Sequence, residues 1–190
     1  MADKRSISRL SSIACVLEAG IEDDFFRYLH QHLLGNGSPE VGYFQPLPRS
    51  ESRLSEKKEA QFRASLKLPF GTAGWRKTWV ARGAQGEILG HVDLRARPEI
   101  YAAHRCLLGM GVAHTVRRQG LGTRLLAHAS AWAMACETLE WMDLQVLGGN
   151  LGAIALYRRA GFIVIGETPE MYKIDGNALS LFTMSRKILS

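Results

Sequence analysis

The sequence predicts a mixed α/β fold, in which an antiparallel group of strands comes first and helix-linked strands follow. Two observations lead to this prediction. Residues 83–86 form a glycine-containing turn between two strand-like segments, 77–82 and 87–97, and such a turn is typical of a β-hairpin. Beyond residue 120, segments with the helical period alternate with short apolar runs, which indicates strands connected by helices.

The first seventy or so residues predict one strand and two helices. A strand is expected at 13–17. A helix is expected from residue 21, because apolar residues follow it at four-residue intervals on one face. Residues 35–50 are rich in glycine and proline and predict a loop, and a weaker helix is expected at 55–67.

The remainder of the chain predicts a third strand at 105–113 and then the clearest helix of the sequence. Between residues 121 and 136 the apolar side chains keep the 3.6-residue period for more than four turns. The last expected elements are a strand, a short helix and two further strands, at 141–147, 150–160, 162–166 and 179–187.

Composition sets the class of protein. A chain of 190 residues, 46% of them hydrophobic and 22% charged, can bury the core of one domain, so we expect a single domain over 1–190 and exclude intrinsic disorder. No apolar run approaches the length of a membrane span, and the stretch 13–17 is too short for a signal peptide. Three scattered cysteines without metal-ligand spacing predict buried, reduced thiols, no metal site and a cytoplasmic protein. The net charge of +6 suits an anionic ligand.

An anion site is predicted where the third strand runs into the clearest helix. Arg117, Arg118 and Gln119 follow the strand, and Gly120 and Gly122 open the helix. The free N–H groups of a helix start attract an anion, and glycines let a phosphate approach the main chain closely. The alternative is a tight turn whose arginines are only solvated, and the glycines alone do not decide between the two.

Two other kinds of phosphate-binding loop are excluded. A Walker loop requires Gly-Lys-Ser/Thr, which this sequence lacks. The dinucleotide fingerprint requires a third glycine where Arg124 and Leu125 stand. The earlier pair Gly109 and Gly111 fails in the same way, because His114 takes the place of the third glycine.

Two motifs resemble those of the GNAT superfamily of N-acetyltransferases. Arg117-Arg-Gln-Gly-Leu-Gly122 is similar to its central motif, and Asn150 followed by a helix with Leu156-Tyr157 and then Gly161-Phe162 is similar to its second. The resemblance covers residues 76–187. It implies a central, mixed and twisted sheet of six to seven strands with helices on both faces. Residues 76–187 would form the cofactor-binding core, accompanied by N-terminal helices and a loop at 13–68.

The resemblance also implies acetyl-coenzyme A as the cofactor. By the family's pattern the strands at 105–113 and 141–147 lie parallel and splay apart, and the acetyl group lies in the gap. Asn150 and Tyr157 would flank the thioester. The residues implied for the pantetheine arm are Met110, Gly111 and Val112, and those implied for the pyrophosphate are Arg117, Arg118, Gln119, Gly120, Leu121, Gly122 and Thr123.

Tyr157 is the predicted acid. A tyrosine on a short amphipathic helix is more often a packing residue, and that reading stays open on the sequence alone. In the family, the tyrosine at this place commonly protonates the departing thiolate. A phenol suits this role, because it is neutral at pH 7 and can donate a proton to sulfur.

The proton acceptor is harder to predict. GNAT enzymes that acetylate ribosomal-protein N-termini carry a glutamate where this chain has Gln145, which cannot act as a base. Asp93 is our first candidate, to act through water or to position the amine. The missing glutamate favours an acceptor amine of low pKa. The other candidates are His91, Asp143 and His104, and pairing with Arg95 or Arg97 is the structural alternative for the carboxylates.

The predicted function is transfer of the acetyl group of acetyl-coenzyme A to a primary amine, by direct attack in a ternary complex. The acceptor would be a small molecule or a protein N-terminus, with no nucleic-acid or membrane partner, and a homodimer is left open. One alternative is a catalytically inert acyl-coenzyme A sensor. A basic nucleic-acid-binding module is a weaker alternative, because Arg117 and Arg118 lie in the phosphate loop and are not interleaved with stacking aromatic residues.

Overall fold

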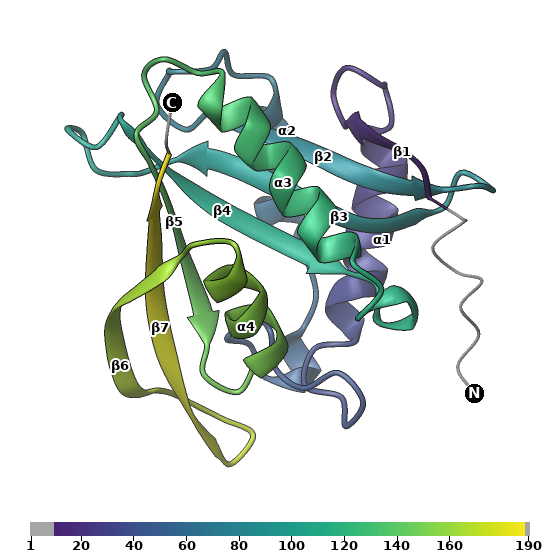
Figure 1. Cartoon of the computed structure of the whole chain (residues 1–190). Helices are drawn as coiled ribbons and strands as arrows, with labels where there is room; N and C mark the ends of the chain where they lie inside the picture. Colours follow the sequence, from purple (N-terminus) through teal and green to yellow (C-terminus); the bar gives the residue numbers. More distant parts are fainter. Residues whose placement is uncertain (1–9, 189–190) are drawn as a thin grey trace.

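The computed structural model describes residues 10–188, and the first nine and last two residues of the predicted domain lie outside this range. Its centre is one seven-stranded sheet in the order β1-β2-β3-β4-β5-β7-β6 (Figure 1). Neighbouring strands are antiparallel except β4 and β5. The strands are β1 (Leu10–Cys15), β2 (Arg76–Gly83), β3 (Ile88–Ala96), β4 (Arg105–Val112), β5 (Trp141–Leu147), β6 (Ile163–Ile174) and β7 (Asn177–Lys187).

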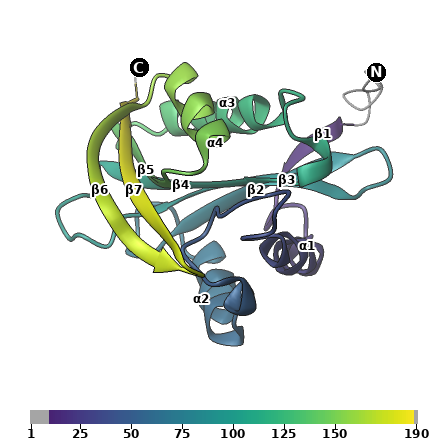
Figure 2. The same cartoon turned by 90° about the horizontal axis from the view of Figure 1, so that it is seen from below.

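Helices cover both faces of the sheet, as predicted. Figure 2 shows α1 (Glu22–Leu34) and α2 (Glu56–Leu66) on one face, and α3 (Leu121–Met134) and α4 (Leu151–Arg159) on the other. The larger apolar cluster packs α3 and α4 against β2 to β5, and the smaller one packs α1 and α2 against Val80 of β2. The mixed fold with six to seven strands is therefore confirmed.

Local sequence signals explain where the helices begin and end. The apolar stripe of α1 is buried, and three acidic residues occupy its first turn, where they complement the helix dipole. Ser55 caps α2 by accepting a hydrogen bond from the backbone N–H of Lys58. Asn150 caps α4 in the same way, through the N–H of Ala153 at 3.3 Å. Gly161 follows α4 with a φ of +86°, the left-handed conformation expected after a helix.

Two strands differ from the prediction. β1 lies at Leu10–Cys15, a few residues before the predicted segment. β6 continues to Ile174, through Pro169, whereas the sequence predicts a strand that stops at residue 166. β6 is an edge strand, so a proline can lie in it without breaking a ladder on both sides, and its register with β7 shifts twice along its length. β6 extends this far because it forms a hairpin with β7, in which Ile174 pairs with Asn177 across a two-residue turn.

The parallel strands β4 and β5 separate after a short contact. They pair only through Arg105 with Trp141, Cys106 with Met142 and Leu107 with Asp143. Beyond these pairs β4 runs on beside β3 to Val112, while β5 runs on beside β7 to Leu147. Figure 1 shows the two strands diverging, with α4 in front of the region between them. The predicted splay is present.

Candidate active site

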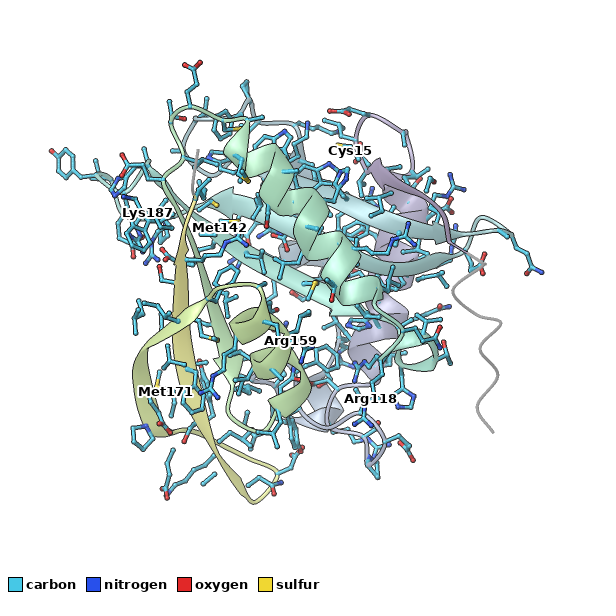
Figure 3. All side chains as sticks on the ribbon, in the orientation of Figure 1. Cys15, Arg118, Met142, Arg159, Met171 and Lys187 are labelled. Atoms are coloured by element: carbon cyan, nitrogen blue, oxygen red, sulfur yellow. The ribbon has the colours of Figure 1, made fainter. Side chains whose placement is uncertain are left out.

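The loop between β4 and α3 leaves the start of α3 open to solvent. After β4 the chain makes one short 3-10 turn, and Gly120 then precedes α3 with a φ of +82°. No side chain among residues 10–188 caps this helix, so its first N–H groups are left for another partner. Arg117 Nε donates to the carbonyl of Val112 at 3.1 Å and holds the loop against the end of β4. Arg118 is exposed, with a φ of +59°, and Figure 3 labels it at the end of the molecule where α3 begins.

Gly122 lies on the inner side of this helix start. A Cβ at this position would come within 3.0 Å of Leu156 Cδ2, and the side chains of Met110 and Val112 are next to it. The glycine therefore allows the first turn of α3 to pack closely on α4 and β4. This packing brings the N–H groups of the helix start to the place where β4 and β5 diverge.

The backbone groups of β4 alternate between β3 and the region beside β5. The N–H of Ala113 donates to the carbonyl of Leu89 on the β3 side. Because the direction alternates along a strand, Gly111 also turns its backbone groups toward β3, where it pairs with His91. Met110 and Val112 turn theirs the opposite way, toward the separating β5.

Gly109 and Gly111 make room for side chains that lie over β4 on the face of α1 and α2. A Cβ at Gly109 would collide with Asp93, and a Cβ at Gly111 would lie 2.6 Å from atoms of both His32 and His91. In the sequence, Gly109 appears only in a failed dinucleotide motif, and Gly111 is also assigned to the pantetheine arm by the family resemblance, but neither is predicted to allow a close approach of side chains. A glycine inside a strand is itself a signal for close approach of another group, and this signal could have found them.

Asp93 is buried, with its side chain 7% exposed, and lies between two arginines. Its Oδ1 is 3.0 Å from Arg95 Nη1 and 3.4 Å from Arg76 Nε. Burial by itself would raise the pKa of this carboxyl, but the charges of Arg95 and Arg76 outweigh it and hold the pKa below its ordinary value. Asp93 is therefore ionised at neutral pH and is a weak base.

Tyr157 points into the core from α4. Its ring packs against Phe162 with centroids 5.8 Å apart, and the side chain is almost completely buried. Burial raises the pKa of Tyr157, and the negative charge of Asp93 raises it further. The phenol is consequently neutral and keeps its proton at any physiological pH. Tyr157 and Asp93, from opposite faces of the sheet, are near enough to interact electrostatically.

The other predicted bases occupy different environments. His91 is buried beside Tyr28, whose Oη is 3.3 Å from Nδ1, and burial lowers the pKa of His91 to about 4. Asp143 accepts hydrogen bonds from Arg97 at 2.8 Å, Arg105 at 2.5 Å and Ser185 at 2.6 Å, at the end where β4 and β5 still pair. These bonds give Asp143 a structural role. His104 precedes β4 at that same end and is exposed.

Gln145 is also exposed, on the part of β5 that pairs with β7, where it lies opposite Thr183. Among the predicted bases, therefore, only Asp93 and His91 lie on β3 beside the diverging part of β4.

Two contacts in the connection between α1 and α2 were not predicted. Asn36 is fully buried, and its Oδ1 accepts hydrogen bonds from the backbone N–H groups of Phe44 (2.8 Å) and Gln45 (2.9 Å). Asp175, in the turn between β6 and β7, accepts hydrogen bonds from Tyr43 Oη at 2.6 Å and from the N–H of Arg49 at 2.9 Å. Because β7 pairs with β5 and α1 lies over β4, the contacts of Asp175 join the two sides of the diverging strands.

Comparison with known proteins decides the family. Residues 44–162, more than half of the chain, match the Acetyltransferase (GNAT) family. The chain belongs to this family. It is therefore an acyltransferase, and the cofactor of its family is acetyl-coenzyme A. The GNAT motifs that the sequence suggested lie where the resemblance placed them, on the helix start of α3 and on α4.

Individual relatives agree with this assignment. The GNAT chain is 32% identical over 111 residues to the 5-NmdU N-acetyltransferase of Pseudomonas phage PaMx11, covering 58% of this chain and 71% of that protein. It is 29% identical over 98 residues to the catalytic subunit of the N-terminal acetyltransferase A complex of Arabidopsis thaliana. That match covers 52% of this chain and spans about half, 51%, of the plant protein.

A solved structure shares the fold. A phosphinothricin acetyltransferase from Sinorhizobium meliloti, in complex with acetyl-coenzyme A, superposes with a TM-score of 0.73 at 18% identity. The superposition covers 93% of this chain and 88% of that one.

Residues 10–188 contain neither a membrane-spanning helix nor a cluster of metal-ligating side chains. No helix there is long and apolar enough to cross a membrane. No group of three or more histidine, cysteine or acidic residues in that range could hold a metal ion. Cys15, Cys106 and Cys136 are free thiols, as predicted, although only Cys106 is fully buried.

Proposed function

We propose that this GNAT protein is an N-acetyltransferase that transfers the acetyl group of acetyl-coenzyme A directly to a primary amine in a ternary complex. The observation that carries the proposal is the divergence of β4 and β5 beside the uncapped start of α3, with Tyr157 buried on the adjacent α4. This arrangement supplies an anion site and a proton donor on two sides of one gap between strands.

The cofactor would bind along β4 and the start of α3. The main chain of residues 118–123 would hold the pyrophosphate, because the N–H groups and the dipole of a helix start favour an anion. Met110 and Val112 would pair with the pantetheine arm, since their backbone groups point away from β3. Gly111 points toward β3, so we assign it no direct contact. Acetyl-coenzyme A supplies an acetyl group that is already activated as a thioester.

Tyr157 would give its proton to the departing sulfur. The raised pKa of this phenol keeps the proton on Oη until negative charge develops on the sulfur nearby. Asn150 is needed first as the cap of α4, and through α4 it positions Tyr157.

The acceptor must arrive as a neutral amine or lose its proton in the site. Asp93 is too weak a base to take a proton from a lysine ammonium unaided, because two arginines stabilise its ionised form. An α-amino group, with a pKa of about 7.7–8.0, is neutral in roughly a tenth of molecules at pH 7. A lysine, near 10.4, is neutral in about one of a few thousand. We therefore propose an amine of low pKa as the acceptor, with Asp93 positioning the amine or an ordered water.

Thiol release from acetyl-coenzyme A tests the proposal, measured against N-terminal peptides, small amines and lysine peptides. We expect turnover with acceptors of low pKa and little with lysine peptides. Binding of acetyl-coenzyme A without turnover on any amine would contradict the proposal and favour the acyl-coenzyme A sensor. Two relatives named above are N-acetyltransferases, which supports the choice of a nitrogen acceptor.

A further inference from the structure

The ionised groups over β4 leave one positive charge unbalanced. Among residues 10–188, Asp93 is the single carboxylate between Arg76 and Arg95. The neighbouring cluster is balanced, because Arg97 and Arg105 face Asp143 and Glu99.

The two histidines packed on this face of β4, His32 and His91, do not change the balance of charge. Burial lowers the pKa of His32 to about 3 and that of His91 to about 4, so both are neutral at pH 7. The face of β4 that α1 and α2 cover is therefore cationic around Asp93.

Of the two arginines, Arg95 is the one that solvent and a ligand can reach. Arg76 has its guanidinium stacked on the ring of Phe62, 3.8 Å from the centroid, and its side chain is 19% exposed. The side chain of Arg95 is 32% exposed. Within residues 10–188 its one hydrogen bond joins Nη1 to Asp93 at 3.0 Å. A guanidinium has five N–H donors in a planar fork, so Arg95 can bind a second anion beside Asp93.

Arg95 also extends toward the diverging strands. Its Nη1 lies 3.0 Å from the point that a Cβ of Gly109 would occupy, so the side chain leans from β3 across β4. Gly109 is two residues beyond Leu107, the last residue of β4 that pairs with β5. The guanidinium therefore lies at the edge of the gap, on the face opposite α3.

We propose that Arg95 binds a carboxylate of the acceptor, and that the substrate class is a primary amine that carries a carboxylate close to the amino group. The proposal rests on the proposed function, because it assigns the acceptor side of the same site. The fork of an arginine matches a carboxylate in two parallel hydrogen bonds. The surplus positive charge would also disfavour the ammonium form of the amine, which assists a site whose carboxylate is a weak base.

Matched acceptors test this inference in the whole 190-residue chain. We would measure kcat/KM for peptides that begin with Asp or Glu against peptides that begin with Asn or Gln, and for free amino acids against their amides. The two sets distinguish a side-chain carboxylate from an α-carboxylate. We expect at least one set to show a preference of about tenfold or more for the carboxylate, since one charge-assisted contact contributes on that order.

Variants then assign the preference to Arg95. Arg95→Gln should abolish the ratio of kcat/KM between carboxylate and amide acceptors, and Arg95→Lys should keep part of that ratio. The ratio is the readout because Arg95 also contacts Asp93, so the absolute rate with the amide acceptors should change as well. Arg27→Gln is the matched control, because Arg27 is an exposed arginine of α1 paired with Asp24. Binding of acetyl-coenzyme A, followed by the melting temperature, should be the same in all three.

The outcomes separate the two proposals. Turnover with equal rates for carboxylate and amide acceptors in the wild-type protein overturns this inference and leaves the proposed function standing. A preference that survives in Arg95→Gln overturns the role of Arg95. Absence of turnover with every acceptor contradicts the proposed function and this inference with it.

Discussion

The backbone N–H of Phe162 donates a 3.0 Å hydrogen bond to the carbonyl of Tyr157. This bond closes a Schellman motif around Gly161, which accommodates the left-handed conformation without a steric penalty. The same turn brings the ring of Phe162 against that of Tyr157. The end of α4 thereby determines where the phenol lies.

Tyr157→Phe should separate chemistry from packing. The substitution keeps the ring and removes only the proton donor, so the melting temperature and the affinity for acetyl-coenzyme A should change little. We expect kcat to fall on the order of 10²-fold. Single-turnover kinetics provide the measurement, because they report the chemical step without product release. An unchanged single-turnover rate would leave Tyr157 as a packing residue.

Arg118→Gly should affect stability and cofactor binding in opposite directions. Arg118 has a positive φ, which strains a residue with a side chain, and glycine relieves that strain. Glycine also gains freedom in the unfolded chain, so the free protein should be unchanged or stabilised by up to about 1 kcal/mol. The rise in melting temperature caused by acetyl-coenzyme A should shrink, because a charge beside the proposed phosphate site is lost.

Glu170→Gly is the control for Arg118→Gly. Glu170 also has a positive φ, but it lies on the edge strand β6. The rise in melting temperature that acetyl-coenzyme A causes in Glu170→Gly should equal the rise in the wild-type protein. If acetyl-coenzyme A raises the melting temperature of Arg118→Gly as much as that of Glu170→Gly, Arg118 does not contribute to cofactor binding.

Asp93→Asn should lower kcat/KM at pH 7 by about tenfold or more. The loss should diminish as the pH rises, because a growing fraction of the acceptor amine is then neutral without help. A pH profile of kcat/KM checks this, together with the acetyl-coenzyme A shift in melting temperature, which should persist. Asp143→Asn also removes a buried carboxylate that faces two arginines, but at the paired end of β4 and β5, and it controls for general destabilisation. Wild-type values of kcat/KM for Asp93→Asn at every pH would refute the proposal that Asp93 positions the amine or an ordered water.

His91 should make the protein sensitive to acid. Burial lowers its pKa to about 4, whereas an unfolded histidine has a pKa of about 6.5. Between these two values the unfolded state binds more protons than the folded state. The contribution of His91 to the free energy of unfolding is therefore complete above pH 6.5. It decreases as the pH falls toward 4, by up to about 1.4 kcal/mol per pH unit for one group.

Urea denaturation between pH 4 and 8 measures this dependence. His32, with a pKa near 3, adds a contribution of the same sign, so His91→Gln should reduce the slope without abolishing it. The slopes should be compared, and not the absolute stabilities, because the substitution also changes packing against Phe25 and Tyr28. Identical slopes for the variant and the wild-type protein would show that His91 is not held neutral by the fold.

The sequence predicted the elements whose signals are local. The period of α3 and the apolar run of β5 each depend on residues within a few positions, so their places could be determined without the rest of the fold. The GNAT motifs are local in the same sense, since each lies within one turn or one helix. The helix start that would hold the pyrophosphate was predicted for this reason.

The tertiary structure decided what depends on how segments of the chain pair and pack. β6 is long because β7 pairs with it, and Asn36 is buried because it satisfies backbone groups of a loop that the sequence predicts only as irregular. Asp93 became a weak base because the sheet register places Arg76 opposite Arg95 and brings both to its carboxylate. Charge and burial act through space, and the distance between two side chains is set only when strands pair. The sequence by itself indicated the family and the helix start that we propose as the cofactor site, whereas the charges around Asp93 arose from the assembled sheet.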